Sequence, residues 1–256
     1  MGVTIKPLRN LSSLVAGGLL RRRARILEFG AQNVFCADHG GEFAQFIRDM
    51  RAFNGVEDSL DLPRTEAIAA GGLMADLMTE CGFDYLAIDI FASKKTILFD
   101  LNCDGVPGDL LSSFDLVTNF GTTEHVLNQF NCFATAHDFA RPGGLIYHDL
   151  PMGGYFFHGY FSYTPLFFFH LAEANEYEIV YRHYWKAPGE AGAVPASAEL
   201  TGHGWPEASM QDWGIEFIFR KTSAAPFRLP VEIGTSNGPV EQAFLERKTP
   251  EMKLLG

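Results

Sequence analysis

Several features that mark other classes of protein are missing from this sequence. It has only four cysteines and no C-x-x-C pair, so it predicts neither a zinc knuckle nor a disulfide framework. Basic residues are outnumbered by acidic ones, 20 to 31, which gives a formal net charge of -11. Because nucleic-acid binding generally requires a basic face, we expect no nucleic-acid partner. The one basic cluster, residues 21–25, is interpreted as a solvated helix end.

Long apolar runs are missing as well. The apolar residues 11–20 are too few to span a bilayer, and the arginines follow them, whereas a secretory signal carries its positive charge first. We therefore expect no membrane partner and a cytoplasmic protein. What the sequence does have is length and apolar content. With 256 residues, 47% of them hydrophobic, it can form one large domain with a buried core.

Buried strands alternate with helical patterns along the chain, which predicts an α/β fold of the Rossmann-like, doubly wound type. We expect a mostly parallel, seven-stranded sheet with a closing antiparallel hairpin, since no helical pattern separates the last two strands. The strands are expected at residues 25–29, 83–91, 95–102, 114–121, 141–151, 177–185 and 215–221. Helices are expected at residues 123–140 and 165–175.

The same patterns suggest how the chain is organised. A main domain is predicted over residues 21–221, after an N-terminal helical extension of residues 1–20. An insertion at about residues 38–82 separates the first two strands, and within it residues 65–83 are expected to form a helix despite Gly71 and Gly72. Residues 222–256 are interpreted as a peripheral C-terminal tail.

A glycine is also missing from the turn after the first strand, "RILEFGAQ". A G-x-G-x-x-G loop needs its second glycine so that the backbone can contact a pyrophosphate, and Gln32 stands at that place. A nucleoside ligand without a phosphate would tolerate Gln32. The acidic residue Glu28 would suit a cation better than an anion.

Polar residues follow the predicted parallel strands at their carboxyl ends, where ligands bind in open α/β sheets. Glu28 and Gly30 follow the first strand, Asp89 the second, Asp100 the third and Asn119 the fourth. A carboxylate at the end of the second strand can accept hydrogen bonds from both hydroxyls of a ribose. Together these positions predict a nucleoside site at one edge of the sheet.

The blocks "ILEFGAQ", "YLAIDI", "LFDLN", "FDLVTNFGTTEHV" and "RPGGLIYHDLP" resemble those of the class I S-adenosylmethionine-dependent methyltransferases, over about residues 21–221. The resemblance implies S-adenosylmethionine as cofactor, with its methionine part near Glu28 and Asn119, its ribose at Asp89 and its adenine at Asp100. The residues so placed at the cofactor are Glu28, Gly30, Gln32, Asp89, Ile90, Asp100, Leu101 and Asn119. Gln32 departs from the family's E/D-x-G-x-G pattern.

Candidate catalytic residues follow the fifth strand. Methyl transfer to a hydroxyl requires a base, and a histidine titrates near neutral pH. The catalytic candidates are His148, Asp149 and His158, with Tyr160 and Tyr163 as neighbours in an acceptor pocket. His125 is expected to stabilise its loop. The pair His148 and Asp149 could hold a divalent metal ion, but the sequence offers no clear set of three ligands, and no metal site is predicted.

The sequence therefore predicts a methyltransferase that acts on a small-molecule acceptor, most simply a hydroxyl of a sugar or another metabolite. A protein acceptor stays open. The alternative is a non-catalytic binding or partner subunit with the same fold, which Gln32 favours. A nicotinamide-dependent oxidoreductase is a more distant third. A homo-oligomer is compatible with the sequence, which is silent on oligomeric state.

Overall fold

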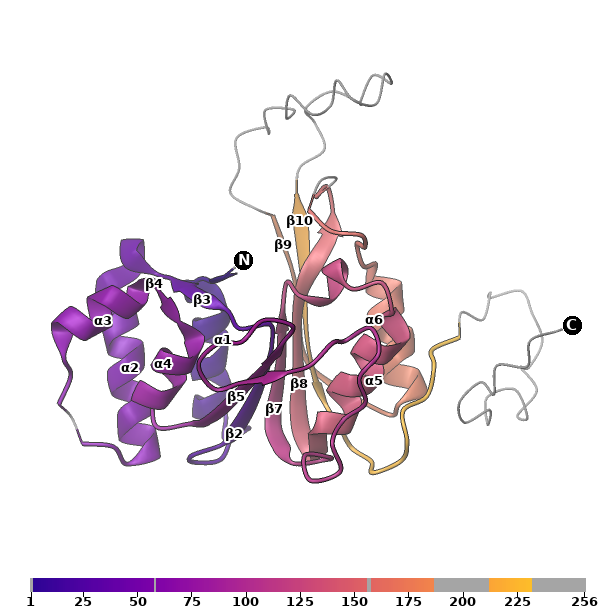
Figure 1. Cartoon of the computed structure of the whole chain (residues 1–256), viewed down its shortest axis with the longest axis horizontal. Helices are drawn as coiled ribbons and strands as arrows, with labels where there is room; N and C mark the ends of the chain where they lie inside the picture. Colours follow the sequence, from indigo (N-terminus) through magenta and orange to yellow (C-terminus); the bar gives the residue numbers. More distant parts are fainter. Residues whose placement is uncertain (1, 58, 156–157, 187–211, 232–256) are drawn as a thin grey trace, which may run out of the picture.

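A seven-stranded sheet forms the centre of the molecule, and helices cover both of its faces (Figure 1). The computed structural model describes residues 2–57, 59–155, 158–186 and 212–231. The strands lie in the order β6-β5-β2-β7-β8-β10-β9. In that order their bounds are Thr96–Leu98, Asp84–Asp89, Arg25–Phe29, Phe114–Phe120, Ala140–Gly153, Trp213–Arg220 and Glu178–Lys186.

Most of this sheet is parallel. Parallel ladders join β6 to β5, β5 to β2, β2 to β7 and β7 to β8, whereas β10 pairs antiparallel with both β8 and β9. The central strands β2 and β7 are buried over nearly their whole length, as expected where helices cover both faces of a sheet. The predicted fold, a mostly parallel seven-stranded sheet with an antiparallel hairpin, is confirmed. The loop predicted between the strands of that hairpin lies outside the described residues at positions 187–211.

The helix predicted over residues 123–140 begins later than expected. A 3-10 turn, η2 (Thr123–His125), follows β7, and the helix α5 spans Gln129–Phe139. Asn128 caps α5, because its side-chain oxygen accepts a hydrogen bond from the backbone N–H of Asn131. The two ionisable residues of η2 consequently lie in a turn at the end of a strand and not on a helix.

The residues between β2 and β5, together with the N-terminal strand β1, build a smaller, three-stranded sheet in the order β1-β3-β4, with helices packed around it. The elements of this region, together with the N-terminal ones, are β1 (Gly2–Val3), α1 (Ile5–Ala16), β3 (Asn33–Phe35), η1 (Ala37–His39), α2 (Gly40–Asn54), α3 (Leu62–Ala69), β4 (Ala70–Leu73) and α4 (Met74–Glu80).

The single helix predicted over residues 65–83 is wrong. The strand β4 separates α3 from α4 and pairs with β3. Gly71 has a φ of +123°, which residues with a side chain rarely adopt, and a Cβ at Gly72 would lie 2.7 Å from the Cα of Ile68. The two glycines therefore end the helical pattern and allow the chain to form a short strand.

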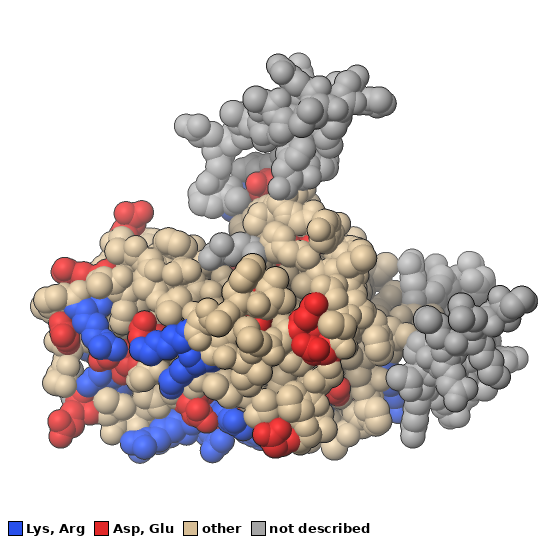
Figure 2. Space-filling model, viewed as in Figure 1, with Lys and Arg blue, Asp and Glu red and all other residues tan. Residues whose placement is uncertain are grey.

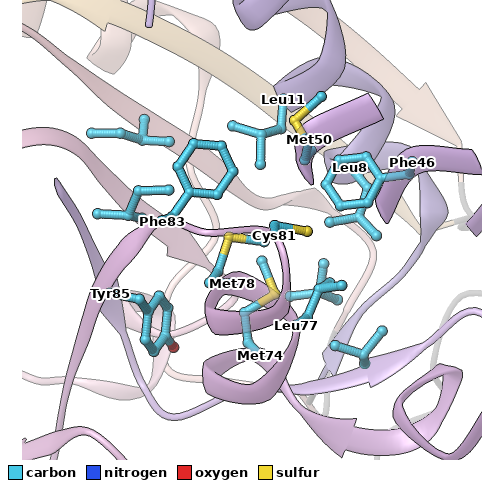
Figure 3. Close-up of a cluster of buried hydrophobic side chains, with 14 of the residues drawn as sticks. Leu8, Leu11, Phe46, Met50, Met74, Leu77, Met78, Cys81, Phe83 and Tyr85 are labelled. Carbon is cyan, nitrogen blue, oxygen red and sulfur yellow. The ribbon is translucent and has the colours of Figure 1, made fainter. Parts of the chain in front are cut away.

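One face of the large sheet is covered by α1, α2 and α4, whose apolar side chains interdigitate above it (Figure 3). Leu8 and Leu11 of α1 reach into this layer, as do Met50 of α2 and Met78 of α4, and each is at most 5% exposed. The N-terminal helix is thus part of the core. The segment predicted as an insertion likewise supplies much of that core.

The other face of the sheet is covered by α5 and by α6 (Pro165–Ala174). Phe168 of α6 stacks on Phe217 of β10, with ring centroids 4.9 Å apart and planes at 11°. The first part of the predicted tail also packs here, because the ring of Phe227 contacts the ring of His137. The rest of that tail, residues 232–256, lies outside the described residues.

Charged side chains gather unevenly on the surface. Figure 2 shows lysines and arginines interspersed with acidic residues over the α2–α4 side, whereas the side of α5 and α6 is largely uncharged in this view. The basic cluster does not end a helix, since α1 stops at Ala16. Instead, Arg21 and Arg141 bind the carboxylate of Asp115, with N–O distances of 2.7 and 2.6 Å. The cluster is therefore partly neutralised within the protein.

Cysteine placement and helix hydropathy add two further facts. Cys36, Cys81 and Cys132 are buried, as predicted for small core residues, whereas Cys103 is exposed, and all four are free thiols. Within the described ranges, no helix has both the length and the apolar character needed to cross a membrane.

Candidate functional site

The carboxyl ends of β2, β5 and β7 meet at one edge of the sheet, and the turn at Gly30 lies between them. Phe29 pairs with Ile88 of β5 on one side and with Asn119 of β7 on the other. The backbone N–H of Gly30 donates to the carbonyl of Ile88 at 2.8 Å. Gly30 has a φ of +75°, and this conformation explains why a glycine stands at this position.

Asp89 lies at the end of β5, beside this turn. One carboxylate oxygen accepts a hydrogen bond from the backbone N–H of Ala31 at 2.8 Å, and the other accepts from the N–H of Phe91 at 2.9 Å. These two bonds fix the carboxylate at the sheet edge. Each oxygen of a carboxylate can accept more than one hydrogen bond, so Asp89 retains the capacity to bind the hydroxyls of a ribose.

Apolar side chains are exposed next to Asp89. Ile90 is 62% exposed, and Phe91 and Leu98 are exposed to a similar degree. Leu98 ends β6 and pairs with Asp89 in the parallel ladder. Large apolar side chains with a carboxylate beside them are typical of a site that holds the flat face of a base and the hydroxyls of its sugar.

Asp100 and Leu101, the next two predicted site residues, lie in the loop after β6 and differ in their surroundings. The carboxylate of Asp100 accepts hydrogen bonds from the backbone and the side-chain amide of Asn102, at 2.8 and 3.0 Å, and the pKa of Asp100 is lowered by them. Leu101 is 6% exposed and packs in the core. Its side chain therefore does not reach the sheet edge, and only its backbone can contribute to a ligand site.

Gln32 fills space beside Gly30. Its side-chain amide donates to the carbonyl of Phe120 and to the hydroxyl of Thr122, both at 3.2 Å. The same hydroxyl donates to the carbonyl of Phe29 at 2.6 Å. A Cβ at Gly30 would lie 2.9 Å from Thr122 Oγ1 and 3.1 Å from Gln32 Nε2. The space that a second glycine would leave open is thus bridged by Gln32 and Thr122.

Glu28 is fully buried beneath the turn. Its carboxyl group accepts hydrogen bonds from the Tyr85 hydroxyl and, at 3.2 Å, from the backbone N–H of Gln32. Burial raises the pKa of Glu28 to about 8, although both hydrogen bonds act in the opposite direction. The structure places Glu28 under the site, where it supports the turn.

Asn119 and His148 lie side by side on β7 and β8, as their register predicts. The Asn119 amide donates to His148 Nδ1 at 3.0 Å and to the Thr123 hydroxyl at 2.9 Å. His148 is 1% exposed and packed against the rings of Phe133 and Phe168. Burial lowers the pKa of His148 to about 3, so the imidazole is neutral and has no path to solvent for a proton.

Asp149 points away from His148, because successive side chains of a strand face opposite sides of the sheet. Its carboxylate accepts a hydrogen bond from Trp185 Nε1 at 2.8 Å, and Glu216 pairs with it across the antiparallel ladder. Burial and the neighbouring Glu216 raise the pKa of Asp149. A metal site formed by His148 and Asp149 together is therefore ruled out by the geometry.

The structure brings together three residues that the sequence did not connect. Glu124 and His125 in η2 lie next to His158, and Glu124 Oε1 is 3.4 Å from His158 Nε2 and 3.7 Å from His125 Nε2. Burial raises the pKa of Glu124 to about 7. Sequence patterns do not single out Glu124, because the residues around Thr123 are typical of a helix start. The one available signal is the adjacent "EH" pair, which begins three positions after the end of a predicted strand.

The two tyrosines expected near an acceptor differ in exposure. Tyr160 is 74% exposed, whereas Tyr163 is buried, and its hydroxyl donates to the side-chain carbonyl of Gln129 at 2.7 Å and lies 3.1 Å from the hydroxyl of Thr123. A pocket of about 360 Å³ opens near the end of β8, and it is lined by Met152, Pro165, Tyr184 and Trp213. Its volume falls in the range of sites for small molecules.

One part of this sheet edge, around Asp89, can hold a nucleoside. The other part, beside Gly30, is filled by a side chain. Asp89 presents a fixed carboxylate beside exposed Ile90, which suits a ribose and a base. Beside Gly30, Gln32 occupies the space that a bound amino-acid moiety would need. The residues present fit S-adenosylmethionine provided that the Gln32 side chain moves or becomes part of the contact.

A comparison with protein families matches residues 66–188 to the model of a methyltransferase domain. The match runs from α3 to the end of β9, and includes the strands that carry Asp89 and Asn119. The glycine turn after β2 lies outside it. No curated protein sequence matches the chain.

Solved structures with a similar fold include several methyltransferases. The 1,6-didemethyltoxoflavin-N1-methyltransferase of Burkholderia thailandensis, solved with 1,6-didemethyltoxoflavin and S-adenosylhomocysteine, is 16% identical over 85% of this chain and 79% of its own, with a TM-score of 0.44. A SAM-dependent methyltransferase from Archaeoglobus fulgidus is 13% identical over 83% and 91%, with a TM-score of 0.43. One from Mesorhizobium loti is 14% identical over 80% and 96%, with a TM-score of 0.38. At these identities and TM-scores the similarities support no inference about the function of this chain.

Proposed function

We propose that this chain is a class I S-adenosylmethionine-dependent methyltransferase and that it transfers a methyl group to a hydroxyl of a small molecule such as a sugar or another metabolite. One observation carries the proposal: Asp89 is fixed at the end of β5, 2.8 Å from the backbone N–H of Ala31 in the Gly30 turn. In an α/β sheet this is the position from which a carboxylate binds a ribose.

The residues at this edge have separate tasks. Asp89 binds the ribose hydroxyls, and Ile90 packs against the base. Asp100 and the backbone of Leu101 lie on the adenine side, while Gly30 and Asn119 flank the methionine part. When bound, S-adenosylmethionine supplies an electrophilic methyl group. The protein's contribution is to hold the acceptor in line with that group and to exclude competing orientations.

The acceptor must lose a proton, and we assign that step to the cluster of Glu124 and His158. Glu124 has no exposed side-chain surface, and His158 is partly exposed and 3.4 Å from it. A carboxylate beside an imidazole orients the ring and stabilises its protonated form. Asp149 is a second candidate for this step, whereas neutral, buried His148 positions Asn119.

The pocket of Met152, Pro165, Tyr184 and Trp213 is the proposed acceptor pocket, and its aromatic residues suit a ring-shaped acceptor.

Calorimetric titration with S-adenosylhomocysteine tests the proposal. We expect micromolar binding by the wild type, and binding weaker by roughly thirtyfold for Asp89→Ala, which corresponds to about 2 kcal/mol. Asp89→Asn, which keeps one acceptor oxygen, should fall between them. Asp109→Ala removes a carboxylate that is exposed in a loop and serves as the matched control, with unchanged affinity. Equal affinities for all four proteins would show that Asp89 is not the ribose ligand.

A second function has an observation of its own. Because Gln32 and Thr122 bridge the space beside Gly30, the domain could instead be a non-catalytic partner subunit that no longer binds the cofactor. A folded wild type that does not bind S-adenosylhomocysteine, together with a Gln32→Gly variant that does, would favour this second function.

A further inference from the structure

Three metal-binding side chains converge where β7 and β8 end. Glu124 and His125 belong to η2, and His158 lies in the segment after β8. One donor atom from each lies within 4.8 Å of the other two, and the two carboxylate-to-imidazole distances are 3.4 and 3.7 Å. Donor atoms that bind one ion at about 2.1 Å with tetrahedral angles are about 3.4 Å apart. Small side-chain movements would therefore place all three around one ion.

The Glu124 carboxylate is buried with few hydrogen-bond partners. Its side chain has no exposed surface, and among the residues that the structure describes neither of its oxygens accepts a hydrogen bond from another residue. The imidazoles of His125 and His158 can balance its charge only when they are protonated. A buried carboxylate without hydrogen bonds is unfavourable unless a cation pairs with it. An ion between the carboxylate and the two imidazoles would supply that cation.

The backbone holds the two parts of the cluster together. The carbonyl of Glu124 accepts hydrogen bonds from the N–H groups of Tyr160 at 2.7 Å and Phe161 at 3.2 Å. Gly159 lies so close that a Cβ there would be 2.9 Å from the Cγ of Glu124. The segment that carries His158 is thus fixed against η2. Backbone hydrogen bonds, and not flexible side chains alone, keep Glu124 and His158 close together.

We propose that Glu124, His125 and His158 bind one divalent transition-metal ion. Imidazole and carboxylate ligands suit zinc, iron(II) and cobalt(II). Three protein ligands leave at least one coordination position open, which is the arrangement of catalytic metal sites, whereas structural zinc sites are closed by four.

The ion has a use in the reaction, and this use, unlike the binding itself, rests on the proposed function. A divalent ion lowers the pKa of a hydroxyl group that binds to it. With the ion bound, the acceptor's O–H bond would break with transfer of the proton to water, and His158 would serve as a ligand. The base role proposed above for Glu124 and His158 applies to the chain without the ion. The site thereby favours acceptors whose hydroxyl can reach an open coordination position.

Zinc titration of the untagged chain, freed of metal with a chelator, tests the site. We expect one zinc ion per chain with micromolar or tighter affinity, and affinity weaker by at least tenfold for Glu124→Gln and for His158→Ala. His39→Ala is the matched control, since His39 is an exposed histidine 3.9 Å from Glu42, and it should leave zinc binding unchanged. Visible absorption of bound cobalt(II), present in the wild type and lost in Glu124→Gln, provides a second readout.

Circular dichroism and titration with S-adenosylhomocysteine on the same samples separate the outcomes. Only millimolar zinc affinity in the folded wild type, or equal zinc affinity in the wild type and both site variants, would overturn the metal site. Zinc binding that depends on Glu124 and His158 supports it even where S-adenosylhomocysteine does not bind, and only the proposed function then fails. Conversely, S-adenosylhomocysteine binding without zinc binding rejects the metal site alone.

Discussion

At the scale of single residues, burial decides the charge of the groups near the site. Glu28, Glu124 and Asp149 are carboxyl groups whose pKa values are raised, and His148 is an imidazole whose pKa is lowered. In each case the low-dielectric surroundings disfavour the charged form. The ionisable residues that sequence reasoning would assign to chemistry are therefore partly neutral groups of the core.

The raised pKa of Glu28 predicts how the free energy of unfolding depends on pH. Its pKa of about 8 in the folded chain exceeds the ordinary value of 4.5. Between these values the folded chain keeps a proton that the unfolded chain has lost, so the free energy of unfolding falls as the pH rises, by up to about 1.4 kcal/mol per pH unit. Glu28→Gln removes this dependence. We predict that urea unfolding from pH 5 to pH 8 shows the variant gaining stability relative to the wild type. Parallel pH profiles of the two proteins would contradict it.

The candidate site shows which residues a sequence can and cannot reveal. Asp89 and Gly30 could be identified because a strand pattern fixes which residue stands at its end. Leu101 was placed at the cofactor, yet its side chain is buried in the core, because a loop's side-chain directions depend on tertiary packing. The cluster of Glu124 with His158 joins two segments more than thirty positions apart, and no local pattern encodes that contact.

At the scale of elements, the helix α1 is held to the sheet by a buried charge as well as by apolar packing. Lys6 Nζ lies 2.7 Å from Glu216 Oε2 in β10, and the Glu216 side chain has no exposed surface. Asn10, one turn further along α1, also donates to Glu216, at 2.9 Å. These contacts join the N-terminal helix to the antiparallel strand of the sheet.

Removing the cation should leave Glu216 buried with an unbalanced charge. We predict that Lys6→Met lowers the free energy of unfolding by on the order of 2 kcal/mol or more, and that Lys6→Met/Glu216→Gln recovers most of the loss. Arg9→Met is the matched control on the same helix. Its partner Glu42 is exposed, and exposed pairs contribute about 0–1 kcal/mol. Urea denaturation of these four proteins and of the single variant Glu216→Gln gives these values. Additive effects of the two substitutions at the buried pair would show that it is not coupled.

The elements also show where sequence patterns fail. The strands of the seven-stranded sheet could be predicted to within a few residues, since buried runs between turn residues indicate parallel strands. The three strands of the smaller sheet were not predicted. The helix over residues 65–83 could not, because β4 forms only through pairing with β3, a strand more than thirty positions away. The start of α5 was misplaced for a related reason: Thr123 and Asn128 are both acceptable caps, and the path of the chain after β7 decides between them.

At the scale of the whole molecule, the sheet divides two cores, and the ends of its parallel strands form the candidate site. The N-terminal half of the chain supplies one core through α1, α2 and α4, and the C-terminal half supplies the other through α5 and α6 (Figure 1). The mostly parallel sheet followed from the alternation of elements, and the antiparallel closure followed from the lack of a helical pattern between the last two strands. The contribution of α1 and of the residues between β2 and β5 to the core could not be predicted, because amphipathic helices do not encode which surface they cover.

A crystal structure of the chain grown with S-adenosylhomocysteine would show whether Asp89 binds the ribose. We expect the ribose hydroxyls at the Asp89 carboxylate, the base against Ile90, and the Gln32 side chain moved from its place beside Gly30. A ligand bound elsewhere, or a crystal without ligand in which Gln32 and Thr122 still bridge that space at saturating ligand concentration, would contradict this expectation.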